Sequence, residues 1–152
     1  MDFFSIIFGL KTHAIFDVWS IEHLLSGVSI GSAIRKQNHK EIARIVSNDE
    51  HTHHSWHFDM LGVLFLAYAW ETLEHYLEVG LAGQAVEWWF QGVEFWPNRL
   101  LADPLMMVIG YAVAKRYPEM VWPARILSLL WLFFHIFVFP HSMYLHTLLG
   151  LE

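Results

Sequence analysis

The sequence predicts an all-α polytopic membrane bundle of about four transmembrane helices, and three observations carry this prediction. Of the 152 residues, 55% are hydrophobic and only 16% are charged, whereas ordinary soluble domains contain about 25% charged residues. Long apolar segments recur along the chain, and the basic residues are concentrated between alternate segments. The length is that of one domain, so we expect residues 1–152 to form a single transmembrane domain.

The apolar segments differ in length and in the role expected for each. Residues 3–10 form a short apolar stretch that we expect to lie at the membrane interface. Four longer segments follow, at about residues 14–34, 58–79, 100–114 and 126–151. A membrane-spanning helix needs about 20 mostly apolar residues, and the first, second and fourth segments reach that length. The third is shorter, so Lys115 and Arg116 at its end would have to extend toward the headgroups.

Prolines mark the expected helix ends. Pro104 lies near the start of the third segment, and Pro118 follows its end. Pro140 is expected to end or kink the fourth helix after Phe139, because proline has no backbone N–H to donate within a helix.

Basic residues lie mainly between the first and second segments and between the third and fourth. Seven occupy these two loops, whereas the other loops contain only Lys11 and Arg99. Short cytoplasmic loops carry an excess of lysine and arginine. We therefore expect both basic loops to be cytoplasmic and both termini to lie on the opposite side. The seven are Arg35, Lys36, Lys40, Arg44, Lys115, Arg116 and Arg125.

Two composition facts exclude classes of function. The net charge is −6 and no basic face is evident, which argues against a nucleic-acid partner. The chain has no cysteine, so disulfides, thiolate metal sites and cysteine nucleophiles are excluded.

The second segment contains the clearest candidate for chemistry. Glu71, Glu74, His75 and Glu78 are spaced so that they share one face of a helix. Carboxylates near hydrocarbon are costly unless they bind a cation, share protons or face water. Glu78 is close enough to the following loop that we expect it to be solvated, whereas Glu71 and Glu74 are expected to be functional.

Other segments supply possible partners for this acidic face. Glu22 and His23 lie in the first segment, which also carries Gly27 and Gly31. That glycine pair allows another helix to approach closely, either within this chain or in a second copy. If the first two segments pack through the Gly27 face, their acids could meet. The sequence therefore predicts a polar site lined by Glu71, Glu74, His75, Glu22, His23 and Asp103.

Asp103 and Arg99 each allow two interpretations. Asp103 is either a partner in the polar site or the N-cap of the third helix, with Pro104 in its first turn. Arg99 is a candidate ion-pair partner for one of the glutamates, because an acid near hydrocarbon requires compensation.

Two further groups of histidines were considered as ligands. His53 and His57 have a spacing usable for a metal, and the run from His51 to His57 superficially looks like one histidine box of membrane di-iron hydroxylases. Those families need several boxes, so a solvated cluster is the favoured interpretation. His135 lies among aromatic residues. It is either an axial ligand for haem or a chlorophyll-type pigment, or a buried histidine bonded to a neighbouring helix.

The order of motifs resembles that of VanZ-like small bacterial membrane proteins. The residues that carry the resemblance extend over about residues 17–118: Glu22-His23, Gly27, Trp70-Glu71, Glu74, Gln91-Gly92, Glu94, Asn98, Asp103 and Gly110. The resemblance implies a four- or five-helix protein of the bacterial inner membrane. It implies no established reaction, and residues after Pro118 are not matched.

Two functions of different classes follow from the sequence. The first is an integral membrane protein whose acid- and histidine-lined site binds a divalent metal or a lipid headgroup amine, with metal-assisted hydrolysis as one reaction of such a site. The second is a non-catalytic accessory or scaffold subunit of a larger membrane complex, which the small size and abundant Trp and Phe favour. Membrane lipid is the expected partner in both, and neither identifies a substrate.

Overall fold

The computed structural model describes residues 3–46 and 56–151. In this part of the chain the regular elements are helices joined by loops, apart from one isolated bridge between Phe8 and Phe16. The elements η1 and η3 are π-helical turns, and η2 is a 3₁₀ turn. In chain order the elements are α1 Phe3–Ile7, α2 Val18–Val46, α3 Trp56–Glu78, α4 Gln84–Phe90, η1 Asn98–Ala102, α5 Asp103–Arg116, η2 Pro118–Met120, α6 Val121–Phe133, η3 Phe134–Val138 and α7 Tyr144–Leu149.

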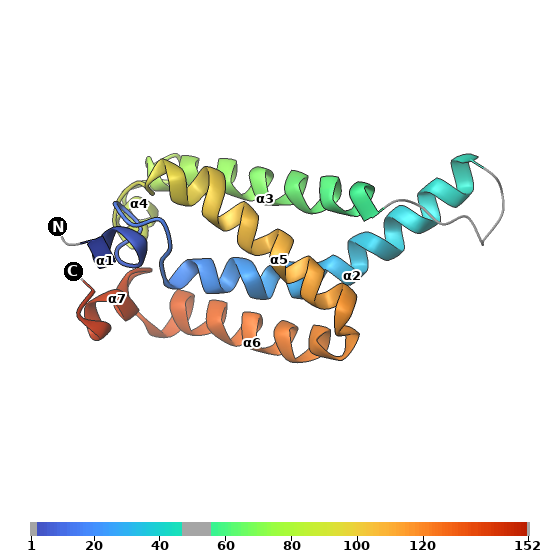
Figure 1. Cartoon of the computed structure of the whole chain (residues 1–152). Helices are drawn as coiled ribbons and strands as arrows, with labels where there is room; N and C mark the ends of the chain where they lie inside the picture. The colour runs from blue at the N-terminus through green and yellow to red at the C-terminus, as the bar shows by residue number, and fades with distance from the viewer. Residues whose placement is uncertain (1–2, 47–55, 152) are drawn as a thin grey trace.

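Helix α2 is the central element of the bundle. It packs mainly against α5 and α6, and it also contacts α3. Figure 1 shows α2 between α3 and α6, with α5 crossing it diagonally and with the second half of α2 extending beyond the bundle. Both ends of the chain lie at the opposite end of the molecule, beside α1, α4 and α7.

The helices bury polar side chains and expose apolar ones. In α3 the buried face contains four carboxylates and only two apolar side chains, Val63 and Ala67. Leu61, Phe65 and Leu73 on the same helix are exposed. A surface helix of a soluble protein has the reverse arrangement, with its apolar stripe facing the core. The buried carboxylates of α3 are Asp59, Glu71, Glu74 and Glu78.

One helix in the described ranges, Pro118–Val138, is long and apolar enough to cross a membrane. This helix comprises η2, α6 and η3, and most of its Leu, Ile and Phe side chains are exposed. The expected helical class is therefore confirmed, whereas the expected number of four spans is not established by length and composition.

The helix ends follow local sequence signals. Asp17 caps α2: its Oδ1 accepts hydrogen bonds from the backbone N–H groups of Trp19 (2.7 Å) and Ser20 (3.0 Å). Helix α5 ends at Arg116, two residues before Pro118. The α6–η3 helix ends at Val138, and Phe139 is extended before Pro140, as a residue preceding proline prefers. The expected ends at Pro118 and Pro140 are thus confirmed.

Glycines allow α2 and α5 to touch backbone to backbone. A Cβ added at Gly27 would lie 2.8 Å from the Cα of Met107, and one added at Gly110 would lie 2.7 Å from the backbone nitrogen of Val28. The expected close packing of Gly27 within the chain is confirmed. Its partner is α5, so the condition that the Gly27 face packs against residues 58–79 is not met.

We predict that Gly27→Ala lowers the free energy of unfolding by about 1–3 kcal/mol, because the added methyl meets backbone that cannot move aside. The matched control is Gly62→Ala in α3, where the nearest atom is a mobile Ile34 methyl carbon at 2.9 Å. The measurement is the thermal midpoint of both variants in a mild detergent. Equal midpoints for the two variants would contradict the close helix crossing.

Candidate functional site

Three buried side chains from three helices converge in the bundle interior. His23 comes from α2, Glu71 from α3 and Asp103 from α5. The Nε2 atom of His23 lies 3.1 Å from Oδ2 of Asp103 and 3.5 Å from Oε1 of Glu71. One ligand atom from each residue lies within 4.8 Å of the others, which is close enough for all three to contact one metal ion.

Three of the four carboxylate oxygens at this triad lack hydrogen-bond partners among the described residues. Neither Oε1 nor Oε2 of Glu71 forms a hydrogen bond, nor does Oδ2 of Asp103. Both residues are almost fully buried, with 1% of Glu71 and 0% of Asp103 exposed. A buried carboxylate oxygen without a partner is strongly unfavourable. The donor set of one imidazole and two carboxylates therefore fits a divalent cation, and the triad His23–Glu71–Asp103 is the candidate metal site.

The residues beside the triad position Asp103. Ser20 lies one helical turn before His23, and its hydroxyl donates a 2.7 Å hydrogen bond to Oδ1 of Asp103. The same hydroxyl oxygen accepts a hydrogen bond from the backbone N–H of Asp17, the residue that caps α2. The start of α2 thus fixes one oxygen of Asp103 and leaves the other facing His23.

The π-helical turn η1 determines what faces the interior just before Asp103. In this turn the backbone N–H of Asp103 bonds to the carbonyl oxygen of Asn98, five residues earlier. Residues five apart therefore come near one face, and Asn98, Arg99 and Asp103 are all buried. Such turns within α-helices are uncommon and are often found at functional sites.

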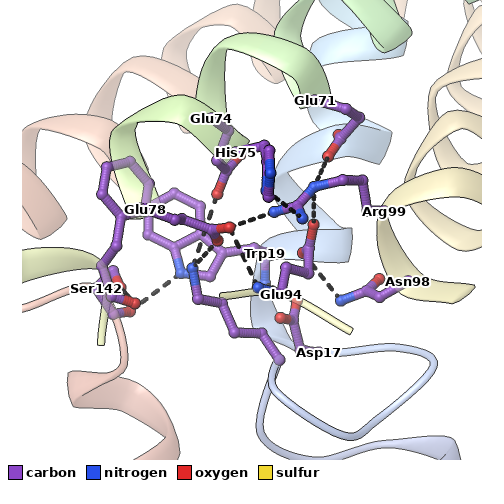
Figure 2. Close-up of polar contacts among 12 residues, drawn as sticks. Asp17, Trp19, Glu71, Glu74, His75, Glu78, Glu94, Asn98, Arg99 and Ser142 are labelled. Carbon is purple, nitrogen blue, oxygen red and sulfur yellow. Dashed lines mark hydrogen bonds and ion pairs between the residues drawn. The ribbon is translucent and has the colours of Figure 1, made fainter. Parts of the chain in front are cut away.

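Arg99 and Lys11 form a second polar cluster next to the triad. Both cations bind Glu78, through the guanidinium Nη2 and the ammonium Nζ. Figure 2 shows Arg99 among Glu71, Glu78, Glu94 and His75; its Nε lies 3.5 Å from Glu94 and 3.9 Å from Glu71. We call this group, with Glu74, the Arg99 network.

Negative groups outnumber positive ones in the interior at this end of the bundle. Two buried cations, Lys11 and Arg99, face six buried carboxyl groups. Burial, and after it the charge of Glu74, raises the pKa of Glu94 to about 11. The other five carboxyl groups are Asp17, Glu71, Glu74, Glu78 and Asp103.

The other residues expected at the metal site lie elsewhere. Glu74 is buried, and its Oε1 lies 4.0 Å from Lys11. His75 is half-buried and accepts a 3.2 Å hydrogen bond from Arg99. Glu22 faces α6, where it accepts hydrogen bonds from Ser128 and, at 3.1 Å, from Ser26. The structure therefore groups His23, Glu71 and Asp103, but not Glu74, His75 or Glu22, around one point.

The structure resolves the alternative roles of Asp103 and Arg99 and corrects the expected exposure of Glu78. Asp103 does not cap α5, since the helix continues from η1 without a side-chain cap. Arg99 does pair with glutamates, as expected. The expectation that Glu78 is solvated is wrong: 1% of this residue is exposed, because Lys11 from the N-terminal segment and Arg99 enclose it.

The histidines considered as other ligands lie away from the triad. His135 is buried between Trp19 and Trp131, at ring-centroid distances of 4.9 Å from each. Its Nδ1–H donates to the carbonyl oxygen of Trp131 at 2.9 Å, and its Nε2 has no hydrogen-bond partner. His57 is exposed at the start of α3, and residues 51–54 lie outside the described ranges.

Sequence reasoning missed two residues that shape the site. Lys11 was counted only as a loop charge, yet it is 1% exposed and is bound to Glu78. Ser20 was not singled out, although it holds Asp103. The signal for Ser20 was available, because it lies one helical turn before His23 on the same face. No local pattern indicates the path that brings Lys11 into the bundle.

We predict that Glu78→Gln lowers the free energy of unfolding by about 3 kcal/mol, because it leaves two buried cations without their shared anion. The control is Glu119→Gln, which neutralises an exposed acid and should change stability by less than about 0.5 kcal/mol. Thermal and urea unfolding in detergent measure both. Adding Lys11→Met to Glu78→Gln should recover part of the loss, and failure to recover any would contradict the pairing.

Comparison with known proteins adds no assignment. No family model, no curated protein and no solved structure matches this chain.

Proposed function

We propose that this chain is a multi-pass membrane protein that binds one divalent metal ion between its helices, at His23, Glu71 and Asp103. The observation that carries the proposal is the convergence of the three buried side chains with unpartnered oxygens of both carboxylates beside the imidazole. A cation at this point would supply the partner that the oxygens lack and would reduce the excess of negative charge nearby.

The membrane assignment is supported by where the apolar residues lie. Lipid tails solvate apolar side chains, so a lipid-facing helix needs no apolar stripe toward the core. Exposed Leu, Ile and Phe residues cover the outer faces of α3, α5 and α6, while the acids and His23 face inward. Buried ionisable groups that face the interior of a bundle mark functional sites in membrane proteins.

Helix lengths fit this assignment. Helix α3 has 23 residues, which corresponds to about 35 Å, and a hydrocarbon core is about 30 Å thick. The 29 residues of α2 extend over about 44 Å, so its basic second half would project into the cytoplasm. Mean hydropathy is averaged over all faces of a helix. The buried acids of α3 therefore lower the mean hydropathy of this helix, although its outer face is apolar.

The distribution of exposed charge favours both termini outside the cytoplasm. The seven basic residues of the two predicted cytoplasmic loops are exposed or half-buried at one end of the bundle. The two remaining basic residues, Lys11 and Arg99, are both buried. The opposite end therefore presents no exposed lysine or arginine among the described residues, which favours the predicted orientation. The VanZ-like resemblance would place this membrane in a bacterium.

The chemistry of the three ligands limits which metal ions fit the site. One imidazole and two carboxylates form a donor set that suits Zn²⁺, Mn²⁺ or Fe²⁺ better than Ca²⁺, which prefers oxygen ligands alone. Three protein ligands leave coordination positions for water or substrate, the arrangement of catalytic rather than structural sites. A metal held there would activate a bound water or polarise an oxygen of a substrate.

A non-catalytic subunit of a larger membrane complex is the second candidate. The exposed aromatic residues of α4 and the following loop favour it, since Trp88 is 58% and Trp96 is 62% exposed. Tryptophan is enriched both at protein interfaces and at the membrane interface. Purification from the native membrane in mild detergent separates the candidates, because a stoichiometric partner would support the subunit.

We predict that Lys40→Cys and Trp88→Cys are labelled from opposite sides of the membrane. The natural chain has no cysteine, so each variant carries one thiol, and both positions are exposed. Intact cells are treated with a membrane-impermeant maleimide, and a second sample is treated after permeabilisation. Trp88→Cys should react in intact cells and Lys40→Cys only after permeabilisation. Labelling of both in intact cells would refute the spanning topology.

We predict that the purified protein binds about one equivalent of Zn²⁺ or Mn²⁺, and that His23→Gln and Asp103→Asn each weaken binding by at least about tenfold. Glu74→Gln is the matched control, because Glu74 lies on the same buried face of α3 but outside the triad. Elemental analysis and competition with a chelating dye give stoichiometry and affinity. Equal loss of metal in Glu74→Gln would refute the triad, and no metal in the parent would refute the proposed function.

A further inference from the structure

A cavity of about 580 Å³ lies at the opposite end of the bundle from the triad. Asp59 of α3 lines this cavity, and it lies twelve residues before Glu71 on the same helix. Twelve residues of α-helix extend over about 18 Å. Val63 and Ala67 lie between them and pack with Met107 and Tyr111 of α5. This apolar layer separates the cavity from the candidate metal site.

The polar lining of the cavity is predominantly basic. Arg35 and Lys36 from α2 and Lys115 from α5 line it, and none of the three forms an ion pair with a described carboxylate. Lys115 instead lies 5.6 Å from the ring centre of Trp56. Three cations in one cavity, with no ion pair to a carboxylate among residues 3–46 and 56–151, favour an anionic ligand.

The one described carboxylate in the lining is already engaged. Oδ2 of Asp59 accepts a 2.7 Å hydrogen bond from the Tyr111 hydroxyl, and Oδ1 accepts a 3.1 Å bond from the Asn38 amide. These bonds hold Asp59 against α2 and α5 and satisfy both of its oxygens. The charge of the cavity lining thus remains positive, because three cations exceed one anion even when His39 is neutral.

Aromatic residues mark the depth of the cavity in the proposed membrane. Trp56 lines it, and Trp122, which follows η2 at the same end of the bundle, is 69% exposed. Exposed tryptophans of membrane proteins lie at the level of the headgroups. Basic cavities between helices on the cytoplasmic side bind the headgroups of anionic lipids.

We propose that this cavity binds a phosphate-bearing anion, through Arg35, Lys36 and Lys115. Guanidinium and ammonium groups together provide bidentate and single hydrogen bonds to phosphate oxygens. The volume is within the range of small-ligand sites, so a phosphate with a glycerol-sized substituent fits. The phosphate belongs either to an anionic phospholipid or to a soluble phosphate compound.

The test is calorimetric titration of the full-length protein in detergent with three probes: a short-chain phosphatidic acid, a short-chain phosphatidylcholine and inorganic phosphate. We expect phosphatidic acid to bind, and we expect Lys36→Gln and Lys115→Gln each to weaken its binding by about tenfold. The controls are Lys40→Gln and Arg116→Gln, which remove nearby exposed charges outside the cavity lining and should change binding less than about threefold.

Each result of this titration decides the proposal. Binding of inorganic phosphate with the same dependence on Lys36 and Lys115 supports the site and identifies a soluble phosphate as its source. Binding of phosphatidic acid alone identifies a lipid. Three results would overturn the proposal. They are binding of phosphatidylcholine as tight as that of phosphatidic acid, equal effects of the cavity and control variants, and no binding by any probe. Loss of metal from the triad should leave phosphate binding at the cavity unchanged, because the apolar layer separates the two sites.

Discussion

The backbone contact between α2 and α5 at Gly27 and Gly110 is the constraint on which the interior depends. It allows the two helices to approach more closely than side chains would permit. His23 lies one turn from Gly27, and Asp103 lies two turns from Gly110. Close approach therefore brings the imidazole to within 3.1 Å of the Asp103 carboxylate. The same contact directs the remaining faces of α2 toward α3 and α6.

Electrostatics dominates the interior at the end of the bundle where both termini lie. Lys11 and Arg99 share Glu78, and this pairing closes the bundle between the N-terminal segment, α3 and η1. The buried acids outnumber the buried cations. Unpartnered carboxylate oxygens occur on Asp17, Glu22, Glu94 and Asp103, and Glu71 has two of them among the described residues. The pairing at Glu78 thus contributes to the fold, whereas the unpartnered oxygens of Glu71 and Asp103 define the candidate metal site.

Much of the fold was predictable because its signals are local. Helical class, the ends at Pro118 and Pro140, and the shared face of Glu71, Glu74 and Glu78 follow from periodicity and backbone chemistry. The partner of Gly27 was not predictable, because a glycine permits close approach without specifying which helix approaches. The burial of Glu78 was missed for a similar reason: Lys11 lies 67 residues away in sequence, and only the path of the chain brings them together.

The π-helical turn before α5 has a consequence for helix register. A π turn contains one residue more than the corresponding α turn, so it shifts the helical phase by about 100°. Asn98 thereby faces the interior together with Arg99 and Asp103. In an uninterrupted α-helix, Arg99 would still share the face of Asp103, because it lies four residues earlier, whereas Asn98, five residues earlier, would turn away. The π turn thus turns the Asn98 side chain inward, where its amide donates a 3.1 Å hydrogen bond to Oε1 of Glu94.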